Sequence, residues 1–253
     1  MPLTVHQFPC LSDNYGFLVR DEKSGLAACI DTPDAGAILR EASALGWQLA
    51  LILNTHWHAD HAGGNAEIKA ATGAAVVGPA EVTRTGPVDR EVRGGDVVSL
   101  GETRFEVIEV GGHTLGHIAY YDAQDRLAFV GDTLFALGCG RLFEGRPEQM
   151  WASLQRLAGL PDETRVYCAH EYTASNARFA LSVDDDPRLA ARAAEIFAAR
   201  ARGEPIVPTT IGLEKATNPF LRAPELAARI GAPREPAYEA FAAVRAAKDK
   251  FKG

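Results

Sequence analysis

The sequence predicts an α/β fold, in which packed β-sheets are covered by helices, with an all-helical domain at the C-terminus. Two observations lead to this prediction. Up to about residue 173, apolar strand-like runs alternate with short turns and a few helical stretches, as in packed sheets with covering helices. Beyond residue 173 the sequence becomes alanine-rich and helical. We therefore expect a mixed domain over residues 1–173 and a smaller helical domain over residues 174–253.

Eight runs in the first domain have the length and apolar character of strands. They span residues 16–20, 26–30, 49–53, 75–77, 104–110, 118–121, 127–130 and 166–169. Turn-forming residues at 21–25 and 122–125 predict hairpins. Helices are expected from Asp34 to Leu45, after Gly64 and over residues 148–158.

The second domain is expected to contain four helices. They span residues 175–182, 187–202, 224–230 and 235–248. The segments Asp-Asp-Asp-Pro at 184–187 and Gly-Glu-Pro at 203–205 separate them as capping and helix-breaking signals.

Composition and charge argue against several classes of function. The chain has 253 residues, 47% of them hydrophobic, and a formal net charge of −7. The acidic net charge disfavours nucleic-acid substrates, which bind a basic face, and the apolar runs are too short to cross a bilayer. No secretory signal is apparent at the first residues, so we expect a cytoplasmic protein without nucleic-acid or membrane partners. We also expect a monomer.

The four cysteines provide no obvious disulfide or metal motif. Cys10, Cys29, Cys139 and Cys168 form no C-x-x-C pair. Reduced and mostly buried thiols are the simplest interpretation.

Seven histidines and aspartates follow strand-like runs in four places, and they suggest a metal centre. The densest group comes directly after the run 49–53 and contains His56, His58, Asp60 and His61. Residues two apart in an extended segment project to the same side, so His56 and His58 can reach one ion together. The turn at residues 62–65 would direct Asp60 and His61 toward a neighbouring position.

Three further candidates, His113, Asp132 and His170, each follow a predicted strand. Loops at strand ends are the usual place for a functional site. A lone histidine in such a place is more often structural, but three imidazoles and a carboxylate within six residues have no reason to occur in a core.

Imidazole and carboxylate ligands suit two borderline divalent ions, of which zinc is the first choice and iron or manganese are alternatives. Two ions sharing a water can deliver hydroxide at neutral pH. The sequence therefore predicts a metal-dependent hydrolase in which Asp60 and Asp132 hold the ions and orient the hydroxide. His6 is expected to be structural. His117 is expected either to support a ligand or to be structural.

The motif Thr-His-Trp-His-Ala-Asp-His at 55–61, with Gly-His-Thr at 112–114, Gly-Asp-Thr at 131–133 and Ala-His-Glu at 169–171, resembles the metallo-β-lactamase superfamily. Segments 138–145, 168–173, 218–222 and 248–252 are similar to the glyoxalase II, or hydroxyacylglutathione hydrolase, family. The resemblance covers essentially the whole chain. It implies an αββα sandwich followed by a helical substrate-binding domain, and hydrolysis of S-D-lactoylglutathione to D-lactate and glutathione.

The resemblance also implies roles for individual residues. One metal ion is assigned to His56, His58 and His113, the other to Asp60, His61 and His170, with Asp132 as the bridge. For the glutathione thioester it points to Arg141, Phe143, Tyr172, Arg245 and Lys248. Family members often have lysine and tyrosine at the first two positions; Arg141 keeps a cationic donor, whereas Phe143 offers no hydroxyl. Without the resemblance, Arg245 and Lys248 read most simply as a solvated basic helix end, and Tyr172 as a half-buried anchor.

Other functions are open to the sequence. Within the superfamily they are a β-lactamase, a nuclease, or a persulfide dioxygenase with a single iron. Outside enzymes, the chain could be a metal-binding or thiol-sensing module that works through Cys139 or Cys168, although no neighbouring base or paired cysteine supports a reactive thiol.

Overall fold

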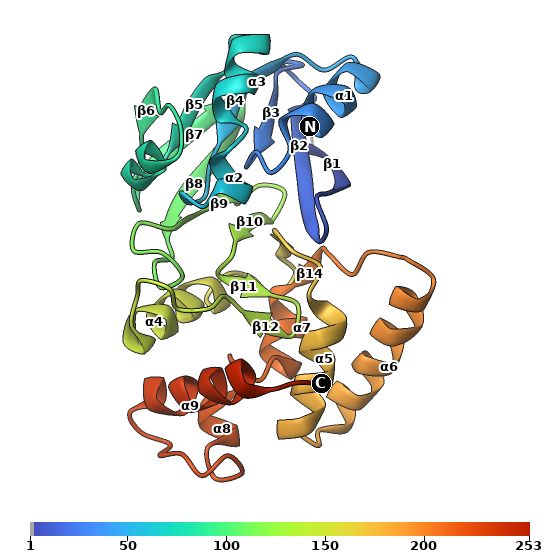
Figure 1. The fold of residues 1–253 in the computed structure, drawn as a ribbon, viewed down its shortest axis with the longest axis vertical. Coiled ribbons are helices and arrows are strands. Elements are labelled where there is room, and N and C mark those ends of the chain that lie inside the picture. Colours follow the sequence, from blue (N-terminus) through green and yellow to red (C-terminus); the bar gives the residue numbers. More distant parts are fainter. Residues whose placement is uncertain (1–2) are drawn as a thin grey trace. The chain divides into compact units, whose positions relative to one another are not determined.

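The computed structural model describes residues 3–253, which divide into two compact units (Figure 1). Unit 1 comprises the described residues through Glu109 together with Gly116–Gly131, and unit 2 comprises Val110–Leu115 and Asp132–Gly253. This division is by compactness, and the domain boundary between residues 173 and 174 stays a prediction.

Unit 1 contains a mixed sheet of six strands. Its order is β1 (Leu3–Cys10), β2 (Asn14–Asp21), β3 (Ala27–Ile30), β4 (Leu49–Leu53), β5 (Ala75–Gly78) and β6 (Arg90–Glu91). The first three strands are antiparallel, whereas β3 to β6 are parallel. Parallel neighbours need crossover connections, which α1 (Ala35–Leu45) and α3 (Asn65–Thr72) supply.

Helix α1 has clear local signals at both ends. The Asp34 side chain accepts a hydrogen bond from the Ala37 N–H, and Gly46 closes the helix in the left-handed conformation. The apolar face of α1 buries Ile38 in a cluster with Ile68 of α3 and Ile52 of β4. Helices α1 and α3 therefore cover the outer face of this sheet.

The second sheet of unit 1 contains an antiparallel run of β7 (Val97–Leu100), β8 (Thr103–Glu109), β9 (Ile118–Asp122) and β10 (Leu127–Gly131). It packs against the inner face of the first sheet. The Tyr120 hydroxyl donates to the carbonyl oxygens of Asn54, at 3.0 Å, and Val77, at 3.2 Å. The ring of Phe17 lies 5.9 Å from that of Phe129. This packing of two sheets with helices outside is the predicted sandwich.

Unit 2 is mainly helical. Its elements are the hairpin β11 (Leu134–Phe135) and β12 (Gly138–Cys139), α4 (Pro147–Ala158), the pair β13 (Arg165–Cys168) and β14 (Thr209–Thr210), and the helices α5 (Thr173–Val183), α6 (Pro187–Ala201), α7 (Ile211–Thr217), α8 (Ala223–Leu226) and α9 (Ala237–Lys250).

Two buried polar residues anchor the β11–β12 hairpin: Glu214 in α7 and Asn218 directly after this helix. The Glu214 carboxylate accepts from the Leu137 N–H at 2.8 Å and forms an ion pair with Arg192. The Asn218 amide donates to the carbonyl oxygens of Phe135, at 3.1 Å, and Gly138, at 3.0 Å. Because both groups are fully buried and satisfied, they hold the short hairpin in place.

The eight predicted strands and most predicted helices are confirmed to within about three residues. The helix predicted over 224–230 is wrong beyond Leu226, because residues 227–230 form turns before Gly231 adopts a positive φ of 67°. The strands β6, β7, β11, β12 and β14, the single-turn helix α2 (Ala59–Ala62), the 3-10 helix η1 (Ala80–Arg84) and helix α7 were not predicted. These are short segments in which a hydrophobic period cannot develop.

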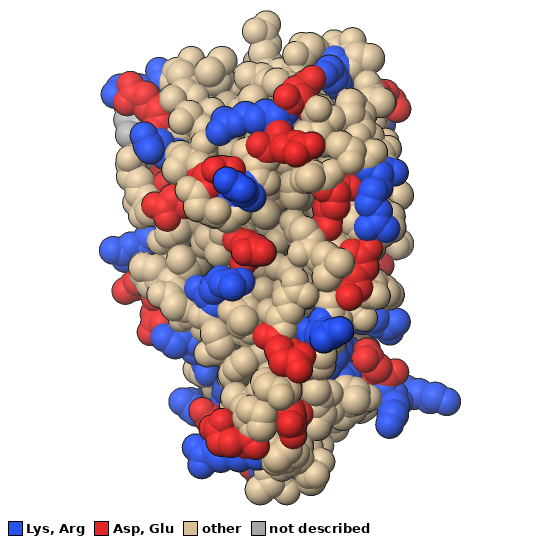
Figure 2. Space-filling model, turned by 90° about the vertical axis from the view of Figure 1, so that its left-hand side faces the viewer, with Lys and Arg blue, Asp and Glu red and all other residues tan. Residues whose placement is uncertain are grey.

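No helix among the described residues is both long and apolar enough to cross a membrane. On the face shown in Figure 2, acidic and basic side chains are interspersed. This face has no extended basic surface of the kind that binds nucleic acids.

Replacing Tyr120 by Phe should lower the free energy of unfolding by about 1 kcal/mol, because the variant loses a donor to two buried carbonyl groups. Urea denaturation measures the change. Tyr121→Phe is the matched control, since Tyr121 is also buried on β9 and its hydroxyl has no hydrogen bond among the described residues. An equal loss in both variants would contradict the proposed role of the Tyr120 hydroxyl.

Candidate metal centre and substrate cavity

Four of the predicted ligands come together in unit 1. After β4 the chain bends at Thr55 and has no regular structure through His58, and the Nε2 atom of His56 lies 3.0 Å from Nδ1 of His58. The next residues form α2 (Ala59–Ala62), which carries Asp60 and His61. Their Oδ2 and Nε2 atoms lie 3.6 Å apart. The two imidazoles thus lie side by side, although segment 56–58 is not a strand.

Asp31 fixes the orientation of His61, although it was not among the predicted site residues. Its Oδ2 atom lies 2.8 Å from Nδ1 of His61 and accepts from the Thr55 hydroxyl at 2.8 Å. Its Oδ1 atom accepts from the Thr55 N–H at 2.7 Å. An aspartate directly after a strand was the pattern that identified Asp132, and the same signal at the end of β3 would have identified Asp31.

His117 packs against a predicted ligand. Its ring stacks on that of His56 with centroids 4.5 Å apart and an angle of 18°. Gly131, at a positive φ of 48°, leaves room for it, because a Cβ atom there would lie 2.8 Å from the His117 ring and 2.5 Å from the Thr55 hydroxyl. His117 therefore supports the ring of His56 rather than standing apart from the site.

The other three predicted ligands come together in unit 2. Asp132 directly follows the last residue of β10 in the chain. Its Oδ2 atom lies 3.5 Å from Nε2 of His113, and its Oδ1 atom lies 3.3 Å from Nε2 of His170. One carboxylate thus lies within reach of two imidazoles. All three residues are buried.

The donor atoms in these clusters fit divalent cations. Nδ1 of His113 lies 2.8 Å from the Arg141 carbonyl oxygen, which can only accept, so Nδ1 carries the proton. Nε2 of neutral His113 then carries a lone pair and lies close to a carboxylate oxygen. The hydrogen bond from Nδ1 of His61 to Asp31 leaves a lone pair on Nε2 of His61 in the same way. Two ligands about 2.1 Å from one tetrahedral zinc are roughly 3.4 Å apart. The observed separations of 3.3–3.6 Å match this spacing, as expected for a dinuclear divalent metal site.

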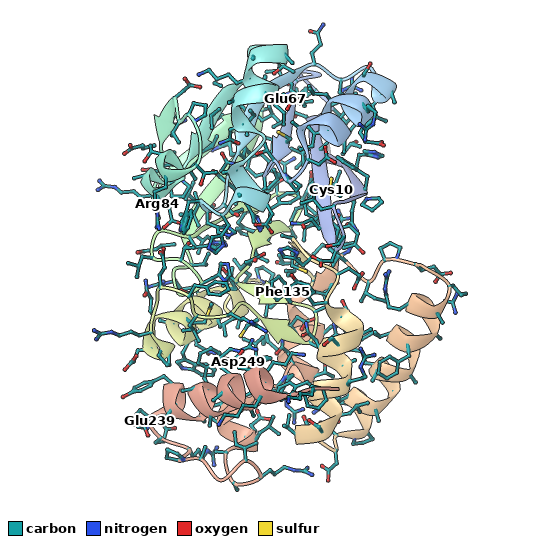
Figure 3. All side chains as sticks on the ribbon, in the orientation of Figure 1. Cys10, Glu67, Arg84, Phe135, Glu239 and Asp249 are labelled. Atoms are coloured by element: carbon teal, nitrogen blue, oxygen red, sulfur yellow. The ribbon has the colours of Figure 1, made fainter. Side chains whose placement is uncertain are left out.

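A cavity of about 440 Å³ in unit 2 contains the predicted substrate-binding residues. Its walls include His113 and Asp132, and also Phe135 and Asp249, which Figure 3 labels. All five residues predicted to contact substrate line it: Arg141, Phe143, Tyr172, Arg245 and Lys248.

Arg245 and Lys248 of α9 are not a solvated helix end, so this interpretation of the sequence is wrong. Arg245 is only 5% exposed, and its guanidinium donates to the Cys139 carbonyl oxygen at 2.8 Å and to Asp249 at 2.9 Å. The Lys248 ammonium donates to the Ser175 carbonyl oxygen at 3.1 Å. Burial lowers the pKa of Lys248 to about 8, and the charge of Arg245 adds to this effect.

Two aromatic side chains link the cavity to the predicted ligands. Tyr172 stacks on His170 with centroids 4.7 Å apart and planes within 4° of parallel. Phe143 is 63% exposed, although its ring lies 5.2 Å from that of His113. A large apolar ring left open beside a metal-ligand candidate is suited to contact a bound molecule.

The cysteines lack the properties of reactive thiols. All four are buried, and burial raises the pKa of Cys139 to about 11 and that of Cys168 still further. Reactive cysteines instead have lowered pKa values. This finding counts against a thiol-sensing module.

Comparison with known proteins identifies the family. Residues 24–170 match the model of the metallo-beta-lactamase superfamily, and residues 171–251 match the model described as hydroxyacylglutathione hydrolase C-terminus. The hydroxyacylglutathione hydrolase of Maricaulis maris is 58% identical over 253 residues, which cover 98% of this chain and 99% of the relative. The chain belongs to the hydroxyacylglutathione hydrolase family of the metallo-beta-lactamase superfamily.

Solved structures agree with this membership. ETHE1 from Myxococcus xanthus is 28% identical, with a TM-score of 0.68, and the match covers 96% of this chain and 90% of that protein. A protein named TTHA1623, solved in a di-iron-bound form, is 27% identical with a TM-score of 0.63, and the match covers 86% of this chain and all of that one. Solved structures therefore match most of this chain, and one of them was solved in a di-iron-bound form.

Replacing Asp31 by Asn should lower metal affinity by about 10-fold to 100-fold, because the Asp31 carboxylate no longer holds the His61 ring in its orientation. Asparagine tolerates the positive φ of 57° at this position. Competition with a chromophoric chelator measures the affinity. Asp34→Asn is the control, because it removes the same charge and asparagine remains a good helix cap. Wild-type affinity in Asp31→Asn would contradict the role given to Asp31.

Proposed function

We propose that the chain hydrolyses hydroxyacylglutathione thioesters, with S-D-lactoylglutathione converted to D-lactate and glutathione. The cavity in unit 2 carries this proposal. It places three cationic side chains, Arg141, Arg245 and Lys248, in the same space as His113 and Asp132. Glutathione is a tripeptide with two carboxylates, so cations that line the same cavity as a reacting centre suit it.

The metal ions are proposed to be held as the family resemblance implies. One ion would be held by His56, His58 and His113, the second by Asp60, His61 and His170, and Asp132 would be shared by both. When bound, such ions lower the pKa of water toward neutrality and polarise a carbonyl oxygen. Zinc is the proposed metal, with iron or manganese as alternatives, since nitrogen and oxygen donors accept all three.

The residues around the ions keep the reaction geometry fixed. Asp60 and Asp132 orient the attacking water, and Asp31 and the Arg141 carbonyl fix the tautomers of His61 and His113. Arg141, Arg245 and Lys248 hold the glutathione carboxylates, while Tyr172 and Phe143 contact its backbone and acyl group. The leaving thiolate has a parent pKa of about 8.5 and departs without a strong general acid.

We further propose that residues 1–173 form the catalytic domain and residues 174–253 the helical substrate-binding domain. The family-model matches meet close to this boundary, at residues 170 and 171. The chain is proposed to act as a cytoplasmic monomer on this small-molecule substrate.

A panel of substrates tests the reaction class. The metal-loaded chain should turn over acyl-glutathione thioesters at least 100-fold faster than a lactam or a phosphodiester. Chelation should abolish this activity, and added zinc should restore it, because metal activation of water is the source of the nucleophile. Elemental analysis should find two ions per chain; a single iron with no thioesterase activity would instead support the persulfide dioxygenase.

The pH dependence of KM tests the role of Lys248. Its charge is present below pH 8 and is lost above it, so KM for an acyl-glutathione should rise above pH 8 while staying level near pH 7. Lys248→Arg should remove this rise, because arginine stays charged to pH values above 12. Lys250→Arg is the control, since Lys250 is exposed on the same helix. An unchanged pH profile in Lys248→Arg would refute the assignment.

A further inference from the structure

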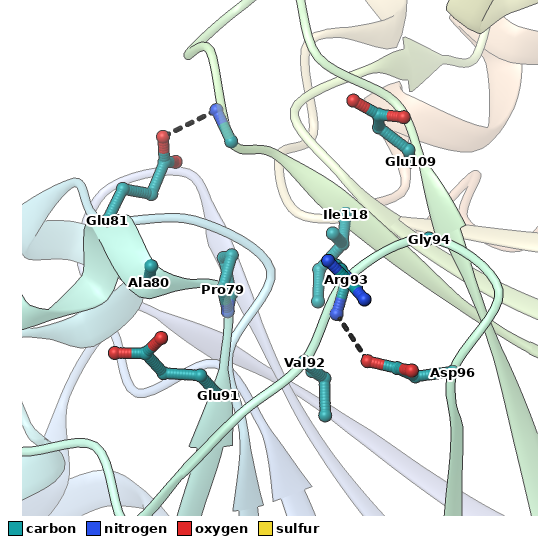
Figure 4. Close-up of a pocket in the computed structure, with 11 residues that line it drawn as sticks. Pro79, Ala80, Glu81, Glu91, Val92, Arg93, Gly94, Asp96, Glu109 and Ile118 are labelled. Carbon is teal, nitrogen blue, oxygen red and sulfur yellow. Dashed lines mark hydrogen bonds between the residues drawn. The ribbon is translucent and has the colours of Figure 1, made fainter.

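Two consecutive backbone amides between His113 and His117 are each bound by a glutamate. In unit 2, the Leu115 N–H donates to the Glu144 carboxylate at 3.1 Å. In unit 1, the Gly116 N–H donates to the Glu81 carboxylate at 2.6 Å, as Figure 4 shows. Neither glutamate belongs to the predicted ligands, and neither lines the substrate cavity.

Both hydrogen bonds act at the exposed middle of an otherwise buried segment. His113, Thr114 and His117 are buried, whereas the Leu115 side chain is 56% exposed and Gly116 has no side chain, so side-chain burial does not order the backbone at these two residues. Gly111 and Gly112 precede His113, and Gly112 adopts a φ of 145° that favours glycine. A short loop with flanking glycines has high conformational entropy unless its amides are bound. Bonds from amides to carboxylates are charge-assisted and about twice as strong as neutral ones.

Glu144 also belongs to a segment that is bonded directly to His113. The His113 carbonyl oxygen accepts from the N–H groups of Phe143 and Glu144, both at 3.3 Å. The His113 ring donates to the Arg141 carbonyl oxygen. The segment 141–145 therefore fixes the His113 ring and backbone, and Glu144 extends this support two residues further along the loop.

Glu81 supports the other end of the same loop. Gly116 precedes His117, whose ring stacks on His56. Glu81 lies on the short 3-10 helix η1 (Ala80–Arg84), and that helix also contacts the loop of the first four ligands. The Arg84 guanidinium lies 3.7 Å from the Trp57 ring centroid, and the Thr85 hydroxyl donates to the Trp57 carbonyl oxygen.

We propose that Glu81 and Glu144 are positioning residues for the metal centre: by binding the amides of Gly116 and Leu115, they hold the loop that presents His113. They contact neither substrate nor ion, and they act through the ligands. This inference rests on the proposed metal site, although its test does not depend on which substrate the enzyme takes.

Metal affinity of the full-length chain tests the proposal. Chelator competition should show that Glu81→Ala and Glu144→Ala each weaken zinc binding by about 10-fold to 100-fold, the usual effect of losing an outer-shell partner. Glu81→Gln and Glu144→Gln keep an acceptor oxygen and should stay within about threefold of the wild type. A role in overall stability alone would not produce this rescue.

Matched controls separate the hydrogen bonds from the loss of charge. Glu91→Ala removes a carboxylate from the cavity that Glu81 lines (Figure 4), and Glu148→Ala removes one from the start of α4, four residues after Glu144. Neither carboxylate has a hydrogen bond or ion pair among the described side chains. Both control variants should bind zinc as the wild type does. Alanine variants with wild-type affinity, or glutamine variants as impaired as the alanine ones, would overturn the proposal.

Hydrogen exchange gives a second measurement if an alanine variant does not fold. The amides of Leu115 and Gly116 should exchange slowly in the wild type and in the glutamine variants, despite the exposed Leu115 side chain. Exchange at the rate of an unprotected amide would refute the proposal. If the chain binds two zinc ions tightly but does not hydrolyse thioesters, the proposed substrate is refuted and this inference still holds.

Discussion

The functional site depends on the close approach of nitrogen and oxygen atoms at the spacing of two ligands of one cation. In His113, the Nδ1–H group donates to the Arg141 carbonyl oxygen, and in His61 it donates to Asp31. In the neutral form of each ring, Nε2 therefore carries a lone pair. Each lies 3.5–3.6 Å from a carboxylate oxygen. A divalent ion between such atoms would attract both of them. The surrounding hydrogen bonds therefore hold the donors in an arrangement that suits an ion.

The two units contribute to this arrangement in different ways. In unit 1 strand β4 is followed by a short irregular segment and a single helical turn, which bring four predicted ligands close together. In unit 2 the predicted ligands lie in loops, and the β11–β12 hairpin that follows Asp132 is held by the buried polar residues Glu214 and Asn218. The same hydrogen-bonded loops therefore carry both the predicted ligands and the predicted substrate-binding residues.

The cations of the cavity follow a related principle. On α9 Arg245 is buried and Lys248 is half-buried, and each donates to a backbone carbonyl. Burial of an ammonium is unfavourable, and it lowers the pKa of Lys248 to about 8. An anionic ligand would offset this cost, so the cavity gains more from binding carboxylates than a solvated pair of cations would. Phe143 and Tyr172 supply the apolar surface that lies beside the predicted ligands.

The sequence alone predicted packed sheets covered by helices, the helical C-terminal part and the seven metal-ligand candidates, because hydrophobic periodicity and dense histidine spacing are local properties. It did not predict Asp31, Glu81 or Glu144, since each acts on a residue at least 29 positions away. The burial of Arg245 was also decided by tertiary structure. Its position near the basic end of a helix is typical of a solvated side chain, and only the packing of α9 against the segment around Cys139 buries it. Local sequence specifies which donors are present, whereas tertiary packing decides which are desolvated and which partners hold them.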